Sequence, residues 1–198
     1  GFDVLLKAWA RAFAEDDPVE LVLHTYGARR PGWTLEEGLR QLGTAGEHAP
    51  IRWSRPTPLL KLVLLYNRCD AFVTATRGEG WGLPVFEALA CAKPVIAPAF
   101  GALAEVLDGT IADLVEVEST PASFGWGDGD GAGDLGFWGE PRVDHLAALL
   151  RRAYEDRERG VDLGRRGRAA VLERFTWGHS ADRTLAALDA PAVLGGER

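Results

Sequence analysis

The fold is decided by residues 70–87, which read DAFVTATRGEGWGLPVFE. The apolar run at 70–76 predicts a buried strand, and Pro84 suits the first turn of a following helix, where its missing N–H would have no partner. A strand, a glycine-rich turn and a helix in succession place residues 77–83 at the carboxyl edge of a parallel sheet. Open α/β folds bind their ligands at that edge.

Strands and helices alternate outward from this stretch. Apolar residues at helical spacing predict the helices, and compact apolar runs between turn residues predict the strands. Such alternation with short links is typical of right-handed crossovers and of a parallel sheet covered by helices on both faces. The sequence therefore predicts an α/β, Rossmann-like fold. The predicted elements are helices at 2–13, 35–42, 59–66 and 84–91, strands at 19–25, 51–54, 70–76, 94–97 and 111–117, and a helical turn at 103–107.

The last third of the chain departs from that alternation. Residues 119–139 are rich in glycine and aspartate and predict a long surface loop, whereas Trp138 and Trp177 are expected to anchor a core. Helices are predicted after the loop at 143–154, up to Phe175 and at 177–188. The expected division is an α/β domain at 1–140, a helical extension of the same domain at 141–190 and a tail at 191–198.

The composition limits the possible partners. A formal net charge of −7 over 198 residues argues against nucleic-acid binding, which needs a positive surface to displace counterions. No apolar run reaches about 18 residues and there is no signal peptide, so no membrane-spanning segment is expected. Cys69 and Cys91 lie in apolar helical contexts and predict buried free thiols in a reducing, cytoplasmic setting. The chain starts at Gly1 with a helix under way, which indicates a fragment.

The glycine-rich turn carries the candidate chemistry. Its glycines let the backbone approach a ligand closely, and the amides of Gly82 and Leu83 point out of the helix N-terminus without helical partners. With the positive end of the helix dipole they form an anion site of a size suited to phosphate. Glu79 before the helix and Glu87 inside it flank this site. A carboxylate can accept two hydrogen bonds from the vicinal hydroxyls of a ribose or a hexose.

At these residues the chain resembles the retaining GT-B glycosyltransferases of the family 4 type, whose signature is Glu, seven residues, Glu. Here the signature is EGWGLPVFE, from Glu79 to Glu87. The resemblance covers nearly the whole chain. The other matching segments are GFD (1–3), LLKAW (5–9), LYNRCDAFV (65–73), ALACAKPVIAP (88–98) followed by Gly101 and Glu105, WGEPRVDHL (138–146) and RFTW (174–177).

The resemblance implies a fold, a reaction and site roles. The fold would be the C-terminal half of a GT-B enzyme without its first strand, and the reaction would be retaining hexosyl transfer from a nucleoside diphosphate sugar to an acceptor hydroxyl. Glu79 would be the catalytic-site residue that holds the donor sugar, and Glu87 would hold the ribose. No metal or cofactor is expected, because amides, a helix dipole and cations can stabilise the departing diphosphate. The donor sugar and the diphosphate would contact the loop residues Glu79, Gly80, Trp81, Gly82 and Leu83.

The chain departs from the family pattern at three places. Ala92 and Ala102 stand where the family commonly has glycine, which implies a mild change at a helix end and a stiffer loop facing the sugar. The family's phosphate-binding arginine and lysine come just before the residue that is Gly1 here, as does the strand that leads to them. The N-terminal domain that receives the acceptor is therefore an expected partner that these 198 residues do not include.

Other residues near the carboxyl edge keep two interpretations. Ser54 and Arg55 end a short strand near the place where this family seats the nucleobase, a placement inferred from strand order alone. Arg29 and Arg30 could reach a diphosphate, although a surface turn is the favoured interpretation. Arg77 is interpreted as the structural counter-ion of the first glutamate of the signature.

Two other functions fit parts of the pattern. A GT-B phosphorylase with pyridoxal phosphate would need a Schiff-base lysine, for which Lys7, Lys61 and Lys93 are the candidates. A non-catalytic domain of the same fold could bind a nucleotide sugar or a protein partner. The aspartate–glycine run at 128–134 lacks two ligands that an EF-hand needs, and the histidines have no metal-ligand spacing.

Overall fold

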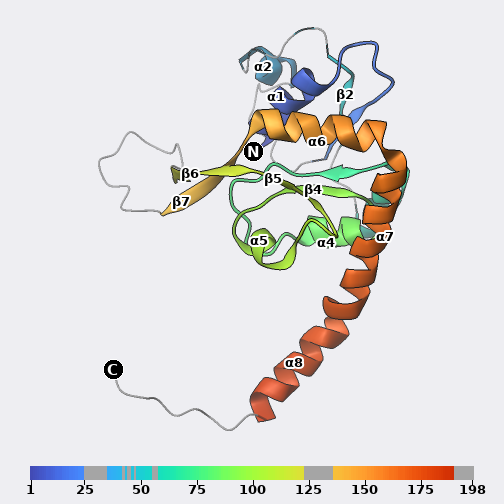
Figure 1. Cartoon of the computed structure of the whole chain (residues 1–198), viewed down its shortest axis with the longest axis vertical. Coiled ribbons are helices and arrows are strands. Elements are labelled where there is room, and N and C mark those ends of the chain that lie inside the picture. The colour runs from blue at the N-terminus through green and yellow to red at the C-terminus, as the bar shows by residue number, and fades with distance from the viewer. Residues whose placement is uncertain are drawn as a thin grey trace.

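The computed structural model describes residues 1–24, 35–41, 43, 46, 48–54, 58–122 and 136–189. The strands are β1 (Leu21–His24), β2 (Ile51–Ser54), β3 (Phe72–Val73), β4 (Val95–Pro98), β5 (Asp113–Val115), β6 (Val117–Pro121) and β7 (Phe137–Pro141). The helices are α1 (Phe2–Ala12), α2 (Leu35–Gln41), α3 (Leu59–Arg68), α4 (Leu83–Ala90), α5 (Ala102–Val106), α6 (Val143–Glu155), α7 (Arg157–Arg174) and α8 (Trp177–Asp189). Strands lie between a helical layer with α1 and α6 and another with α4 and α5, as Figure 1 shows. The predicted α/β fold is confirmed.

The parallel strands form two sheets. β1 pairs with β2, whereas β3, β4 and β5 pair side by side in that order. A doubly wound sheet has the order 3-2-1-4-5-6, and removing strand 1 leaves 3-2 and 4-5-6. The observed orders, β2-β1 and β3-β4-β5, match the expected sheet without its first strand.

Alternate residues of β4 face two hydrophobic cores. Ile96 belongs to the core that contains α1 and α6, whereas Val95 and Ala97 belong to the core that contains α4, α5 and α7. Successive side chains of a strand point to opposite faces of the sheet, so a strand covered on both faces is buried throughout. This double covering explains why the β4 sequence is a continuous apolar run.

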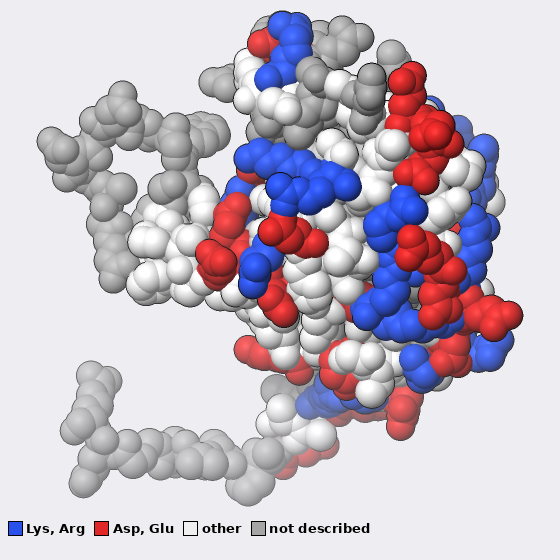
Figure 2. Space-filling model, turned by 45° about the horizontal axis from the view of Figure 1, so that its top comes forward, with Lys and Arg blue, Asp and Glu red and all other residues white. Residues whose placement is uncertain are grey.

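A buried carboxylate ties α6 and α7 to the sheet. Asp113 on β5 is 4% exposed, and its Oδ atoms lie 2.6 Å from Nη2 of Arg152 and 2.9 Å from Nη1 of Arg159. A buried charge is costly unless it is paired, and two guanidinium groups provide the pairing here. Elsewhere, Figure 2 shows acidic and basic side chains interleaved over the face that it displays.

The prediction of one loop over 119–139 is wrong at both ends. The chain there forms the antiparallel hairpin of β6 and β7. Glycine and proline have low β-propensity, so the local pattern hides these strands. A Cβ at Gly139 would lie 2.4 Å from Cγ of Phe100, and glycine is needed where β7 passes that ring. Residues 123–135, which include the whole aspartate–glycine run at 128–134, lie outside the described residues.

Helix α8 extends away from the two cores (Figure 1), and none of its residues is buried. Trp177 is 85% exposed, so the prediction that it anchors a core is wrong, while Trp138 on β7 is half-buried. The apolar pattern predicted helix α8 correctly but could not show whether its apolar residues are buried. In the described part of the chain, no helix is both long and apolar enough to cross a bilayer.

Two features expected from the sequence take a different form. Cys69 and Cys91 are free, as predicted, but they are half-buried rather than buried. Ala92, where the family commonly has glycine, has a φ of 56°. This left-handed conformation costs an L-residue roughly 1–2 kcal/mol, so the departure at the end of α4 is a strained one.

Candidate functional site

The loop between β3 and α4 crosses the carboxyl edge of the three-stranded sheet. It ends at Gly82, the N-cap of α4, which has φ 85° and ψ 42°. A Cβ at this position would lie 2.6 Å from Cδ2 of Leu103 on α5. The left-handed backbone therefore favours glycine here, and a larger residue would also have to displace the end of the Leu103 side chain.

The start of α4 has no side-chain cap. The amide of Val85 donates to the carbonyl oxygen of Gly82 at 2.8 Å and closes the first turn, and Pro84 has no N–H to place. Within the part of the chain that the structure describes, the amides of Gly82 and Leu83 have no hydrogen-bond partner. Such amides at a helix N-terminus, with the dipole behind them, are suited to an anion.

Glu79 lies beside this helix start. Its Cγ is 3.4 Å from the position of a Cβ on Gly82, and its carbonyl oxygen is 3.6 Å from that of a Cβ on Gly101. The residue is exposed, and its carboxylate makes no hydrogen bond or ion pair with any described residue. This carboxylate is free to accept hydrogen bonds from a ligand at the start of α4.

Arg77 does not act as the counter-ion of Glu79, so that prediction is wrong. Its guanidinium donates to both carboxylate oxygens of Asp3, at 2.8 and 2.7 Å, and to Glu140 on β7 at 2.8 Å. The carbonyl oxygen of Arg77 also accepts a bond of 2.9 Å from the amide of Gly139. Arg77 thus joins the loop between β3 and α4 to α1 and to the hairpin, because a planar guanidinium can bind two carboxylates at once.

The cluster of Arg77, Asp3 and Glu140 also lowers the pKa of Asp3. Burial favours the neutral acid of Asp3, but the hydrogen bonds and the charge of Arg77 outweigh burial and lower the pKa of Asp3 to about 2. Neither these ion pairs nor the lowered pKa of Asp3 could be predicted from the sequence, because Asp3, Arg77 and Glu140 are far apart along the chain.

Glu87, one turn inside α4, is held by a residue that sequence reasoning missed. The hydroxyl of Tyr66 on α3 donates to its Oε2 at 2.9 Å and lies 3.3 Å from the carbonyl oxygen of Pro84. Burial raises the pKa of Tyr66, and the hydrogen bond to Glu87 raises it further. The phenol therefore remains a donor and fixes one oxygen of Glu87. Tyr66 lies in the LYNRCDAFV segment, whose match to the family was the available signal.

Trp81 is the aromatic member of the loop. Its ring stacks on that of Phe86 with centroids 5.3 Å apart and an interplanar angle of 12°. Trp81 is 46% exposed whereas Phe86 is 7% exposed, so the indole lies over a buried ring and presents its other side to solvent.

Of the two residues expected at the nucleobase, Ser54 lies on the other parallel sheet. Ser54 ends β2 opposite His24 of β1, and its Oγ is 3.3 Å from Nδ1 of that histidine. Arg55, Arg29 and Arg30 lie outside the described residues. The structure thus gathers residues 79–83 and 87 around the start of α4 but records no contact between that group and Ser54.

Acidic and histidine side chains gather nowhere in a way that suits a metal, as far as the described ranges show. No group of at least three His, Cys, Asp or Glu residues is arranged to hold an ion there.

Comparison with known proteins assigns the chain to a family. The family model described as "Glycosyl transferases group 1" matches residues 1–125. A D-inositol 3-phosphate glycosyltransferase of Geodermatophilus obscurus is 31% identical over 197 residues, covering 96% of this chain and 37% of that protein. An MMP alpha-(1->4)-mannosyltransferase of Mycolicibacterium hassiacum is 31% identical over 188 residues, covering 94% of this chain and 39% of that protein. The chain thus spans less than half the length of these relatives.

Solved structures share the fold. Anabaena Alr3699/HepE in complex with UDP and glucose superposes with a TM-score of 0.69 at 19% identity, covering 95% of this chain and 44% of that one. The C-terminal domain of a group 1 glycosyl transferase (LpcC) from Francisella tularensis gives a TM-score of 0.62 at 20% identity, covering 89% of this chain and 80% of that domain. The expected GT-B architecture is confirmed by this likeness.

Proposed function

Because the chain belongs to the group 1 glycosyltransferases, we propose that it is the donor-binding part of a retaining hexosyltransferase. It binds a nucleoside diphosphate sugar, and the enzyme transfers the sugar to an acceptor hydroxyl with retention of anomeric configuration. One observation carries the proposal: Glu79 and Glu87 flank the uncapped start of α4, where two amides have no partner among the described residues.

The diphosphate is assigned to the amides of Gly82 and Leu83. The helix dipole adds about half a positive charge at this end of α4. The nearby guanidinium of Arg77 is already neutralised by Asp3 and Glu140, so it adds little to anion binding. Amides alone leave most of the diphosphate charge uncompensated, and we expect this chain to bind the donor weakly.

The two carboxylates are assigned to different parts of the donor. Glu79, exposed in the loop before the helix, accepts hydrogen bonds from the hydroxyls of the sugar. Glu87, deeper in α4, accepts hydrogen bonds from the ribose. The support for the second role is the bond from Tyr66, which fixes one carboxylate oxygen and leaves the other open to a ligand.

The nucleobase is assigned to Ser54 and Arg55. The support is the position of Ser54 at the carboxyl end of β2, the edge at which open α/β folds bind ligands. The hydroxyl of Ser54 can donate or accept a hydrogen bond, so this residue does not favour one base over another.

The remaining parts of the reaction lie outside these residues. An N-terminal domain supplies the acceptor site and the cations that complete the diphosphate site, and no metal or cofactor is used. One relative is a D-inositol 3-phosphate glycosyltransferase and another is an MMP alpha-(1->4)-mannosyltransferase, so membership of the family does not select an acceptor. We also propose a cytoplasmic location, because Cys69 and Cys91 are free thiols.

Calorimetry of the 198-residue chain with UDP-, GDP- and ADP-sugars tests the proposal. We expect weak binding of one donor class and no transfer by this chain alone. A matched control is Glu158→Gln, which changes an exposed glutamate on α7 and should bind as the unmodified chain does. Absence of binding to all three donors, or binding that resists Glu87→Gln as fully as Glu158→Gln, would contradict the proposed site. Binding without transfer by a longer form of the protein would favour the non-catalytic alternative.

A further inference from the structure

An aromatic contact from the far end of α7 reaches the loop between β3 and α4, residues 77–82, which we call the donor loop in view of the proposed function. Phe175, the C-cap of α7, has its ring centroid 5.1 Å from that of Phe86 and 6.4 Å from that of Trp81. The Phe175 ring is tilted at 59° to that of Phe86 and lies edge-on at 69° to that of Trp81, whereas Trp81 and Phe86 are stacked at 12°. Phe175 therefore contacts both rings of the stack while the indole keeps its exposed side.

Phe175 is fixed to its own helix. Its amide donates to the carbonyl oxygen of Val171 at 2.9 Å, and the guanidinium carbon of Arg174 lies 5.2 Å from its ring centroid. Edge-on aromatic pairs and cation–π contacts have preferred geometries, so these neighbours restrict the ring in direction as well as in position.

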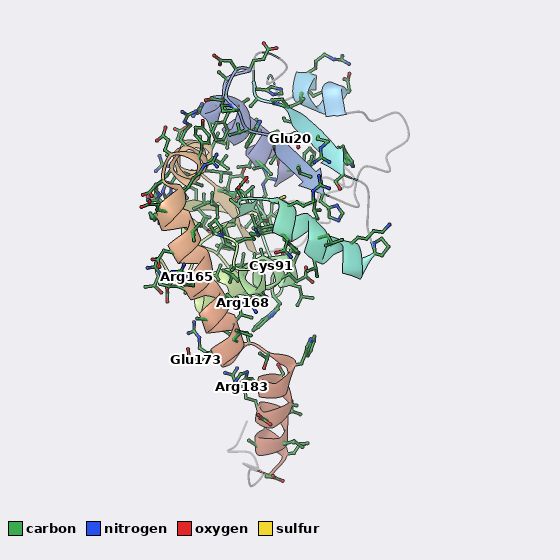
Figure 3. All side chains as sticks on the ribbon, turned by 90° about the vertical axis from the view of Figure 1, so that its right-hand side faces the viewer. Glu20, Cys91, Arg165, Arg168, Glu173 and Arg183 are labelled. Atoms are coloured by element: carbon green, nitrogen blue, oxygen red, sulfur yellow. The ribbon has the colours of Figure 1, made fainter. Side chains whose placement is uncertain are left out.

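Helix α7 is in turn fixed against α4 by glycines. A Cβ at Gly164 would lie 2.2 Å from the carbonyl oxygen of Ala92, and a Cβ at Gly167 would lie 2.4 Å from Cδ2 of Leu89. These close approaches leave no room for α7 to roll on α4. In Figure 3, α7 runs past the end of α4 marked by Cys91, with Arg168 over that end and Glu173 further along. This close packing of α7 on α4 sets the position of Phe175 relative to the start of α4.

Gly82 lies close to Leu103 of α5, but the residues before it have fewer contacts. A Cβ at Gly80 would meet no atom within 4 Å, so nothing packs against that side of Gly80. Arg77 anchors the upstream half through Asp3 and Glu140. Between Gly80 and the helix, Trp81 is the one side chain that reaches a buried neighbour among the described residues.

We infer that Phe175 is a positioning residue for the donor: by holding Trp81 on Phe86 it keeps Glu79 and the loop amides in the arrangement that receives the sugar. The inference rests on the proposed function. Glu87 is held separately by Tyr66, so loss of Phe175 disturbs the part of the site assigned to the sugar and spares the part assigned to the ribose.

Phe175→Ala in the 198-residue chain tests this positioning role by calorimetry. We expect its affinity for the sugar donor to fall about three- to tenfold, the range that loss of an aromatic pair gives, while its affinity for the bare nucleoside diphosphate stays unchanged. Phe175→Tyr keeps the ring and should restore donor affinity. Val171→Ala, which loosens the same core one turn before Phe175 but keeps the three aromatic rings, should leave the ratio of the two affinities unchanged.

Hydrogen exchange gives a reading that does not depend on ligand binding. Amides of residues 80–83 should exchange faster in Phe175→Ala than in Val171→Ala, because the loop loses its downstream anchor. If Phe175→Ala does not fold, Phe175→Leu removes the ring at nearly constant volume and should show the same two effects in smaller degree. An unchanged affinity ratio with unchanged loop exchange would overturn the inference. Faster loop exchange in a chain that binds no donor would uphold the positioning contact and reject the proposed function.

Discussion

Glu79 and Glu87 are eight positions apart and lie at the same helix start, yet they differ in burial and in hydrogen bonding. Glu87 is half-buried and accepts a hydrogen bond of 2.9 Å from Tyr66, whereas Glu79 is exposed and its carboxylate contacts no described polar group. A carboxylate held by its own fold is pre-organised for a ligand group of constant shape. The ribose is such a group, because every nucleotide donor shares it.

The exposed carboxylate has the opposite property. Glu79 lies on a loop that is anchored by ionic contacts at Arg77 and by aromatic contacts at Trp81. Its own side chain has no such contact, so it can change rotamer to suit different sugars if it binds the sugar as proposed. Under the proposed assignment, the difference means that α3 and α4 build the part of the site for the nucleotide and that the loop builds the part for the sugar. The predictions below test this division.

The largest effect is expected on sugar transfer from Glu79→Ala. In a form of the protein long enough to transfer sugar, turnover should fall about 100-fold or more, because a misplaced anomeric carbon loses the orientation that the reaction needs. Steady-state rates with the preferred donor measure the effect, and Glu158→Ala is the matched control. Turnover equal to that of the control would remove Glu79 from the sugar site.

The next largest effect is expected on nucleotide affinity from Glu87→Gln. The substitution keeps the size but removes the charge, and it should weaken every ribonucleotide donor by roughly 1.5–3 kcal/mol, the scale of a charged hydrogen bond. Calorimetry with ribo- and 2′,3′-dideoxyribonucleotides separates the ribose contact from other effects. Equal affinity of the unmodified protein for both kinds of nucleotide would contradict the ribose role.

A smaller effect is expected from Tyr66→Phe, which removes only the hydroxyl that holds Glu87. Ribonucleotide affinity should fall by about 0.5–1.5 kcal/mol, the net value of one hydrogen bond, and should not fall further when Glu87→Gln is already present. Additive losses in the double variant would show that Tyr66 acts on the ligand independently of Glu87.

The smallest effect on donor binding is expected from Asp3→Asn, which weakens the Arg77 anchor. Its main effect is on stability. The pKa of Asp3 is lowered from 3.8 to about 2, so its stabilisation is fully present above its ordinary pKa and is lost as the pH falls through about 2. Urea unfolding from pH 6 to pH 2 should show the unmodified chain losing roughly 1–2 kcal/mol more than Asp3→Asn over the acid range. Parallel curves for the two proteins would mean that Asp3 titrates normally.

The sequence alone predicted the parts of the molecule that local pattern determines. The strand, the glycine-rich turn and the helix across 70–87 lie within a few residues of their predicted bounds, because turn glycines and an N-terminal proline allow few other conformations. Residues 79–83 and 87 do gather at one helix start. This grouping follows from chain connectivity, so no distant contact was needed to foresee it.

The parts that the sequence did not predict depend on distant partners. The sequence suggested Glu79 as the counter-ion of Arg77. In the fold its partners are Asp3, which is 74 positions away, and Glu140, which is 63 positions away. Tyr66 was counted as part of a predicted helix and of a segment that matches the family, with no role of its own, although its hydroxyl donates to Glu87 from α3. The hairpin was missed because β6 and β7 stabilise each other, and neither has a strong strand pattern of its own.

The most direct test is calorimetry of Glu79→Ala with a nucleoside diphosphate and with the corresponding sugar donor. If Glu79 binds the sugar and Glu87 the ribose, the variant should bind the bare diphosphate as tightly as the unmodified chain does, and the additional affinity contributed by the sugar should disappear. Loss of affinity for the bare diphosphate would show that the two roles have been confused. Full retention of the additional affinity would show that Glu79 does not hold the sugar.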